Sequence, residues 1–394
     1  MGQALINAEM LSWARERAGL STSVLAEKLK QSEDKVSAWE AGEDRPTFRQ
    51  AQQFAQQVHV PFGYLFLREP PEDDLPIPDL RTVGDHAPRE ISVDLKDVMR
   101  DVLRRQIWYR DYQVAMDDSA AAVVGRARSS MTADAIVTDM REWLEVPPHP
   151  ERGRWDDYFR DLVQRIERLG ILVMRSGIVG NNTRRVLSVD EFRGFAIADA
   201  VAPVIFINTA DVPEARLFTL VHELAHIWLG ESGISDGDPA NRRRIETLCN
   251  AVAAEFLVPE QEFLPLWQEV EDWKANLAPL AAHFHVSQWV IARRARELEL
   301  IGDQDYRRYV VNRLEAHRNR EEGGGGSFSR VVPGRVSKRL AQAVASEALS
   351  GRLLLRDAYQ LIGVRPHRLK TFARKELGLD VALGRPDAPR SQAR

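Results

Sequence analysis

Residues 218–230 read FTLVHELAHIWLG, and this stretch decides how the rest of the chain is interpreted. His222 and His226 are four residues apart, so on a helix both imidazoles project from the same face. Zinc takes neutral imidazole nitrogens as ligands at about 2 Å in tetrahedral geometry. Glu223 follows one residue round the helix, where its carboxylate can reach a metal-bound water without binding the metal. This is the arrangement of the H-E-x-x-H zinc motif.

A buried structural helix is the alternative to a metal site. The other side chains of the stretch are almost all apolar: Phe218, Leu220, Val221, Leu224, Ala225, Ile227, Trp228 and Leu229. Burying two imidazoles and a carboxylate among such residues is costly unless another group compensates their lost hydration. A bound metal ion supplies that compensation, so the composition of the helix favours a metal site.

A third ligand is expected from a second helix, which the sequence predicts over residues 245–258 (IETLCNAVAAEFLV) before Pro259. A carboxylate at Glu246 would complete a His/His/Glu set and leave a fourth position for water, as in catalytic zinc sites. Asn250, one turn further, lies on the same face and is expected to orient a ligand histidine. Glu255 is the other candidate ligand, but it faces roughly the opposite side of the helix from Glu246.

HELAH followed by ETLCNAVAAEFLVP resembles the active-site helices of the ImmA/IrrE family of bacterial zinc metallopeptidases, whose pattern is close to E-x-x-A-N-x-F-A-A-x-L-L-x-P. The chain departs from this pattern at Cys249 and Val252, and neither position is an expected ligand. The resemblance implies Zn²⁺ as the cofactor and Glu223 as the general base. The zinc ligands that it implies are His222, His226 and Glu246. Further candidates, for contact with an oxyanion or for ordinary core and surface positions, are His283, His285, Tyr158 and Tyr309.

Composition indicates a globular chain of two to four domains: 394 residues, of which 44% are hydrophobic and 28% charged. The sequence contains no run of about eighteen apolar residues, which argues against a membrane span. The start, MGQALINAEMLSWARERAG, lacks the basic and apolar blocks of a signal peptide. The single cysteine, Cys249, excludes an internal disulfide and is expected to be a small core residue. We therefore expect a cytoplasmic protein.

Residues 1–68 read as five short helices, with Ser21 and Ser32 as expected N-caps. The pattern GLS, LAEKL, VSAWEAGEDRPT resembles the Xre/Cro-repressor family, which implies a DNA-binding helix-turn-helix. The candidate DNA-reading residues are Ser32, Glu33, Asp34, Lys35 and Ser37. The eight basic and eight acidic side chains of residues 1–68 cancel, so a general attraction to phosphate is missing. Glutamate can still accept from cytosine N4. Contact with a protein partner, or homodimer formation, is the alternative role.

The other regions are assigned by composition and periodicity. Residues 69–90 are rich in proline and acid and form a predicted linker, which resembles the segment joining Xre and ImmA/IrrE modules. Residues 91–155 are a predicted helical support region. Its first helix is expected to place four residues on one face: Val98, Val102, Ile107 and Val114. Residues 156–301 are the predicted zinc peptidase domain, with short strands at 171–174, 193–197 and 203–207.

Residues 302–394 are predicted to be helical and are strongly basic. Residues 301–394 hold 19 Lys and Arg against 10 Asp and Glu, a net charge of +9. Such a charge favours an acidic protein partner or nucleic acid, with a solvated basic surface as the alternative. The run GGGG at 323–326 is a predicted hinge. This C-terminal pattern also resembles long Xre–ImmA/IrrE proteins, which implies a link to toxin–antitoxin pairs.

The expected fold is mainly α, of the α+β class, with a five-helix Xre-type domain, a zincin-like domain with a small sheet, and a C-terminal helical domain. The expected function is a zinc endopeptidase that makes a site-specific cut in a regulatory protein, such as a repressor or a toxin-like partner, coupled to the N-terminal module. The alternative is a DNA-binding regulator or antitoxin with a non-proteolytic zinc site. The intact Glu223 favours the peptidase, because a structural zinc site closes with four protein ligands and needs no base.

Overall fold

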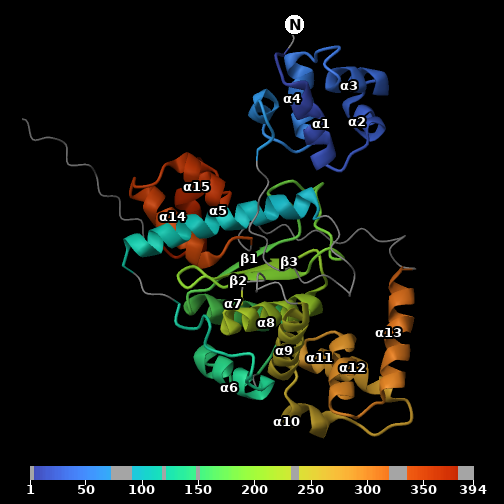
Figure 1. The fold of residues 1–394 in the computed structure, drawn as a ribbon. Helices are drawn as coiled ribbons and strands as arrows, with labels where there is room; N and C mark the ends of the chain where they lie inside the picture. Colours follow the sequence, from blue (N-terminus) through green and yellow to red (C-terminus); the bar gives the residue numbers. More distant parts are fainter. Residues whose placement is uncertain are drawn as a thin grey trace, which may run out of the picture. The chain divides into compact units, whose positions relative to one another are not determined.

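The computed structural model describes residues 4–71, 91–117, 121–147, 151–231, 239–318 and 335–379. These residues divide into two compact units, which are described separately. The first unit comprises residues 4–71 with 91–100, and the second comprises the described residues from 101 onward. Figure 1 shows the elements of both units, coloured along the sequence. Most of the predicted linker, residues 72–90, and the predicted glycine hinge at 323–326 lie outside the described residues.

Five short helical elements make up residues 4–71. They are α1 Ala8–Arg17, α2 Thr22–Leu29, α3 Glu33–Glu40, α4 Phe48–Gln57 and the 3-10 helix η1 Phe62–Phe66. The Ser21 hydroxyl accepts a hydrogen bond from the Val24 N–H (3.3 Å), as an N-cap should. Thr47 and Gln50 form a capping box at the start of α4. Ser32 stands at the N-cap of α3, but its side chain makes no cap hydrogen bond.

The first unit has its own small apolar core, and α2 and α3 pack against each other within it. The larger buried members of this core are Leu11, Leu25, Val36, Trp39 and Phe54. Three residues join α2 to α3, and the first of them, Lys30, has the left-handed φ of 56° that ends α2. The start of α5 (Val93–Ala115) joins this unit through an ion pair between Arg17 and Asp97 (2.8 Å).

The second unit is built round a three-stranded sheet. Its strands are β1 Leu172–Ser176, β2 Gly194–Ile197 and β3 Val204–Asn208. The order is β1-β3-β2, with β1 parallel and β2 antiparallel to β3. All five residues of the central strand β3 are buried, which explains why its sequence is apolar without alternation. β2 lies at an edge of the described sheet.

Helices cover both faces of this sheet (Figure 1). α7 (Trp155–Arg168) packs against β1, and α8 (Pro213–Leu229) packs against β2 and β3 on the same face. The part of α5 from residue 101 lies on the opposite face with α14 (Lys338–Leu349). There the side-chain amide of Gln106 donates to the carbonyl of Ala202 (3.1 Å). The helix α8, which carries the H-E-x-x-H motif, is therefore packed on the sheet.

The remaining helices extend this unit along and beyond the sheet. They are α6 Ala133–Leu144, α9 Pro239–Leu257, α10 Glu260–Phe263, η2 Leu264–Leu266, η3 Trp273–Asn276, α11 Leu277–Phe284, α12 Gln288–Glu297, α13 Asp303–Arg318, α15 Leu355–Ile362 and α16 Pro366–Glu376. The expected mainly α architecture with a small sheet is confirmed. In the part of the chain that the structure describes, no helix is both long enough and apolar enough to cross a bilayer.

The buried face of α5 differs from the predicted one. Val98 and Val102 are buried as expected, but Ile107 and Val114 are 57% and 63% exposed, so the prediction is wrong for these two. The buried positions that follow Val102 are Gln106, Tyr109 and Gln113. Their spacing of three or four residues follows the helical period, whereas Ile107 falls off that face. Hydrophobicity alone misassigned the face because Gln106 is polar yet hydrogen bonded in the interior.

The C-terminal helices are joined to the sheet by polar contacts as well as packing. The Lys338 N–H, at the start of α14, donates to the carboxylate of Glu167 on α7 (3.0 Å). The Arg175 N–H, in β1, donates to the carbonyl of Arg335 (3.1 Å). Burial raises the pKa of Glu167, while hydrogen bonds from Ser337 and the Lys338 N–H oppose that rise. Residues 335–379 are therefore part of the sheet-containing unit.

Deleting residues 335–394 is expected to lower the free energy of unfolding of the second unit by roughly 3–5 kcal/mol. The deletion uncovers apolar surface packed against α14 and removes the hydrogen bonds of Ser337 and Lys338 to Glu167. Thermal unfolding of the full chain and of residues 1–334 measures the difference. An unchanged melting temperature would mean that α14 only rests on the sheet and does not stabilise it.

Candidate metal centre

The helix α8 carries the H-E-x-x-H motif and begins at Pro213, five residues before the stretch 218–230. Gly230 ends it in the left-handed region (φ 70°), where glycine avoids the steric cost of a Cβ. The N–H groups of residues 125 and 127 donate to the carbonyls of Ile227 and Trp228 (3.1 and 2.8 Å). The bond to Trp228 satisfies an acceptor that the helix end would otherwise leave open, and the bond to Ile227 adds to the one from the Gly230 N–H. The last turn of α8, with His226, is thereby held in place.

The three polar residues of the motif are buried. His222 is 0%, Glu223 is 2% and His226 is 8% exposed. The apolar side chains of α8 that surround them belong to the main core of the second unit. In such a low-dielectric setting, charge interactions are stronger than in water. The prediction that α8 combines an apolar surface with buried polar groups is confirmed.

The helix α9 packs against α8 and brings Glu246 to the two histidines. The Nε2 atoms of His222 and His226 are 3.2 Å apart. The Oε2 atom of Glu246 lies 3.3 Å from the first, and its Oε1 atom lies 3.1 Å from the second. Ligands bound at about 2.0–2.1 Å in a tetrahedron are separated by roughly 3.3–3.4 Å. The donor set and its spacing therefore fit zinc. We call these three residues the His/His/Glu cluster.

Within the described ranges, this is the one group of three such side chains whose donor atoms all lie within 4.8 Å of one another. Burial acts to raise the pKa of Glu246, but hydrogen bonds from His222 and His226 lower it well below its usual range. The carboxylate is therefore ionised at neutral pH. An ionised carboxylate beside two imidazoles is a suitable ligand set for a divalent metal.

Cys249 lies beside the cluster on α9 and is fully buried, as the sequence predicted for a core residue. Its thiol is hydrogen bonded to His226. Burial raises the pKa of Cys249, so the thiol is neutral near pH 7. Burial acts to lower the pKa of His226, but its contacts with Cys249 and Glu246 raise it well above the usual value. Cys249 thus contacts a metal-ligand candidate, which the sequence alone did not show.

Glu223 faces the start of the edge strand β2, at a glycine that the sequence analysis did not single out. A Cβ added to Gly194 would lie 2.5 Å from the Thr219 Cγ2, 2.8 Å from the Phe206 carbonyl oxygen and 3.2 Å from the Glu223 Cγ. Such distances leave no room for a side chain. The missing side chain of Gly194 lets β2 approach α8 at Glu223. Its only sequence signal is a glycine inside a strand pattern.

Replacing Gly194 by alanine is expected to lower the free energy of unfolding by roughly 1–3 kcal/mol, because the added methyl group meets Thr219 and a strand carbonyl. The shift required of Glu223 should also slow any reaction that depends on it. Urea denaturation gives the first effect. Gly63→Ala is the matched control, since a Cβ there meets nothing within 4 Å. Equal destabilisation of both variants would refute the close packing at Gly194.

Three other candidates lie outside the cluster. Glu255 forms an ion pair with Arg294, so it is not a third ligand. The Nε2 atom of His283 is hydrogen bonded to a carboxylate oxygen of Glu262 (2.7 Å), and the Nε2 atom of His285 lies 2.8 Å from the Gly153 carbonyl oxygen. These histidines occupy structural and surface positions. Asn250 stands half-buried one turn along α9 from Glu246, and its role in orienting a ligand histidine stays a prediction.

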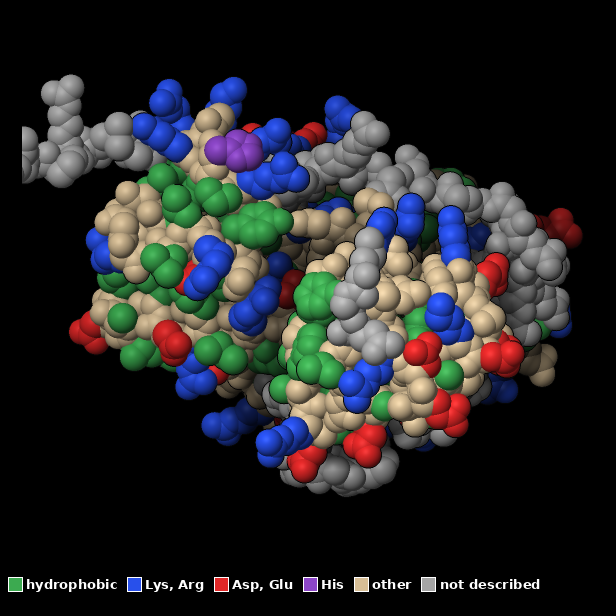
Figure 2. Space-filling model, turned by 90° about the horizontal axis from the view of Figure 1, so that it is seen from above, with side chains coloured by type: hydrophobic (Ala, Val, Ile, Leu, Met, Phe, Trp, Pro, Cys, Tyr) green, Lys and Arg blue, Asp and Glu red, His purple; other side chains and the backbone are tan. Residues whose placement is uncertain are grey.

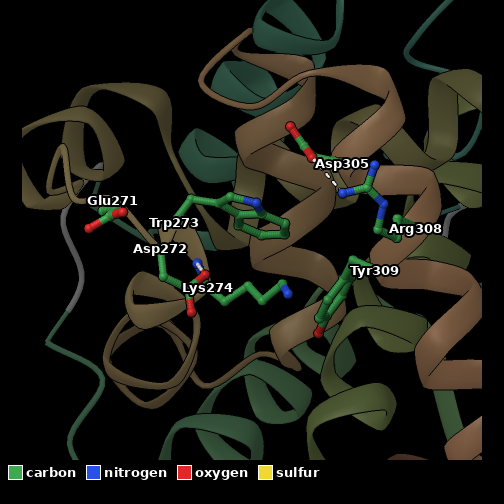
Figure 3. A pocket seen from close by; sticks show the side chains of 7 residues that line it. All are labelled: Glu271, Asp272, Trp273, Lys274, Asp305, Arg308 and Tyr309. Carbon is green, nitrogen blue, oxygen red and sulfur yellow. Dashed lines mark hydrogen bonds and ion pairs between the residues drawn. The ribbon is translucent and has the colours of Figure 1, made fainter.

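The two tyrosine candidates are also elsewhere. Tyr158 is buried on α7, and burial raises its pKa. Tyr309 lines a separate cavity of about 450 Å³ between η3 and α13, where Trp273 lies across from it at 5.7 Å between ring centroids (Figure 3). The other lining residues are Glu271, Asp272, Lys274, Asp305 and Arg308. This cavity contains no member of the His/His/Glu cluster.

The candidate DNA-reading residues lie at the start of α3 in the first unit. Ser32, Glu33, Asp34 and Ser37 are exposed, and Lys35 is half-buried with its ammonium 5.9 Å from the Trp39 ring. The structure thus makes these residues accessible to a partner. Whether the partner is DNA stays a prediction.

Comparison with known families matches residues 166–296 to a peptidase family, Peptidase M78, described as the IrrE N-terminal-like domain. Residues 336–375 match a domain of unknown function (DUF8813). The chain is similar to the radiation response metalloprotease IrrE of Deinococcus radiodurans, with 41% identity over 91 residues. That match covers 21% of this chain and 28% of the relative. The His/His/Glu cluster and Glu223 all fall within residues 166–296, so the region similar to a metallopeptidase contains the candidate metal centre.

Proposed function

We propose that this protein is a zinc-dependent endopeptidase that makes a site-specific cut in a regulatory protein partner, such as a repressor or a toxin-like protein. The observation that carries the proposal is the triangle of donors from His222, His226 and Glu246, with the buried Glu223 one residue along the same helix. Its similarity to a metalloprotease over 91 residues supports the same class. We place its action in the cytoplasm, consistent with a single free cysteine.

In this proposal, zinc held by the cluster would supply Lewis acidity and a water of lowered pKa. Glu223 is the general base: its carboxylate takes the proton of the attacking water and later passes it to the leaving amine. Cys249 holds the His226 ring in position through a hydrogen bond. The apolar core around α8 limits the access of bulk water, which strengthens each of these charge interactions.

The edge strand β2 is the strand to which the substrate is proposed to bind. It pairs with β3 on one side, and its start approaches α8 at Glu223. An extended peptide that adds to such an edge uses main-chain hydrogen bonds, so its scissile bond can be aligned beside the base. A substrate segment must then be extended and accessible, which favours a limited cut in a partner over general degradation.

The first unit is the proposed regulatory module, an Xre-type helix-turn-helix formed by α2 and α3. Support comes from two short helices joined by three residues, with an exposed start of the second helix. The alternative function, a DNA-binding regulator or antitoxin with a non-proteolytic metal site, rests on the same accessibility of α3. This alternative function gives the buried Glu223 no role.

The proposed function is tested by incubating the metal-loaded protein with a library of peptides and reading the products by mass spectrometry. Cleavage that stops with a zinc chelator and returns with added zinc supports the endopeptidase. A repressor or toxin-like protein from a neighbouring gene is the natural second substrate. Zinc binding with no cleavage of either would favour the non-proteolytic alternative.

A further inference from the structure

The three C-terminal helices form a small trihelical arrangement in which α14, α15 and α16 all contact one another. Each helix buries apolar side chains, among them Leu340 and Val344 of α14, Leu361 and Ile362 of α15, and Leu369 and Ala373 of α16. Three residues, 363–365, join α15 to α16, and Gly363 has a left-handed φ of 70°. Two short helices joined by a tight, glycine-containing turn define the helix-turn-helix arrangement.

Contacts from other elements hold this turn in place. Arg104 and Arg105 of α5 donate to the carbonyls of Gln360 and Leu361 (3.1 and 2.7 Å), in the last turn of α15. The Gln342 side chain on α14 donates to the carbonyl of Leu377 (3.1 Å), just past the end of α16. Pro366 stands in the first turn of α16, where its fixed φ suits a helix start. The second helix of the pair is therefore well anchored.

The outer surface of α16 is exposed and basic. Its buried residues, Leu369 and Ala373, are four apart and form one stripe, which leaves the rest of the helix in solvent. The exposed cationic residues over 365–376 are Arg365, Arg368, Lys370, Arg374 and Lys375, against one acid, Glu376. Figure 2 shows Lys and Arg side chains gathered over the C-terminal helices, around a histidine. This surface carries the charge that contact with phosphates requires.

We propose that α15 and α16 are a second helix-turn-helix and that α16 binds the major groove of duplex DNA. The start of a recognition helix carries its base contacts, and here that segment exposes Arg365, His367 and Arg368. Arginine is suited to the O6 and N7 atoms of guanine. Further along, Lys370 and Arg374 are four residues apart, so they share one side of the helix and are in place for phosphates along one edge of the groove.

The helix α16 differs in charge from α3, the corresponding helix of the first unit. α3 opens with Glu33 and Asp34 and carries a single cation, Lys35. Carboxylates at a reading end repel phosphates, whereas the cations of α16 attract them. The main DNA affinity of the chain is thus assigned to the C-terminal helices. This binding does not depend on the proposed peptidase, so Glu223→Gln should bind DNA like the wild type.

The test measures binding of the full chain to a labelled 20-base-pair duplex of mixed sequence by fluorescence anisotropy between 50 and 200 mM KCl. The double variant Arg368→Ala/Lys370→Ala should bind about tenfold more weakly at the higher salt. Its plot of log affinity against log salt should be less steep by about 0.9, because the phosphate contact of Lys370 is lost. An unchanged melting temperature establishes that the variant is folded.

Two control variants remove the same charge elsewhere. Arg307→Ala/Arg308→Ala alters exposed cations of α13, and Arg45→Ala/Arg49→Ala alters exposed cations of the first unit. Both should bind DNA within about twofold of the wild type. A loss of affinity in Arg45→Ala/Arg49→Ala, with none in Arg368→Ala/Lys370→Ala, would overturn the proposal. The proposal would also be overturned if double-stranded RNA or polyglutamate competed as strongly as unlabelled DNA, since the surface would then bind any polyanion.

Discussion

Glu223→Gln is expected to retain zinc and a wild-type melting temperature while losing about 10²–10⁴-fold in the rate of peptide cleavage. Glutamine has nearly the same volume as glutamate and fits the same buried position, which is 2% exposed. The amide cannot accept the proton of the attacking water, so the loss should appear in the catalytic rate and not in binding of the metal. Steady-state cleavage of a peptide, with zinc content measured on the same preparation, gives both values.

The matched control for this change is Glu231→Gln, which alters a half-buried glutamate just past the end of α8. It should cleave at the wild-type rate. Cleavage by Glu223→Gln at that rate as well would show that the activity belongs to another residue or to a contaminant. Loss of zinc from Glu223→Gln would instead mean that Glu223 helps to bind the metal.

The purified protein is expected to hold about one zinc per chain, and His222→Ala, His226→Ala and Glu246→Ala should each lose it. Structural zinc sites with four ligands bind with about 10–16 kcal/mol, so removing one ligand should cost about 3 kcal/mol. That corresponds to an affinity at least about a hundredfold lower. Elemental analysis after dialysis against a weak chelator measures the retained metal, and a competition titration gives the affinity.

Glu255→Gln is the control on the same helix, since Glu255 was the other candidate ligand and forms an ion pair with Arg294. This variant should keep its zinc, although it should be less stable because Arg294 loses a charged partner. Full metal content in Glu246→Ala would remove Glu246 from the ligand set. Loss of zinc from Glu255→Gln at an unchanged melting temperature would point to Glu255 instead.

Much of the candidate site could be predicted because it depends on local geometry. The 3.6-residue period places His222 and His226 together on any helix, and it sets Glu246 and Glu255 on opposite sides of α9. Caps are equally local, so the starts of α2 and α3 were predicted from Ser21 and Ser32. The apolar composition of the zinc-motif helix also required a buried position, which the structure confirms.

Other features could be decided only by the way distant surfaces meet. The sequence contains no sign that Gly194 is needed for close approach to Glu223, because that contact joins a strand to a helix far along the chain. The same holds for the bond from Lys338 to Glu167, which joins the C-terminal helices to the sheet across the predicted hinge. Local periodicity is enough to predict α16 and its apolar stripe. Which face of α16 is exposed, however, depends on α14 and α15, which cover that stripe and leave the basic face in solvent. Local spacing determines which side chains share a helix face, whereas tertiary packing determines what each face meets.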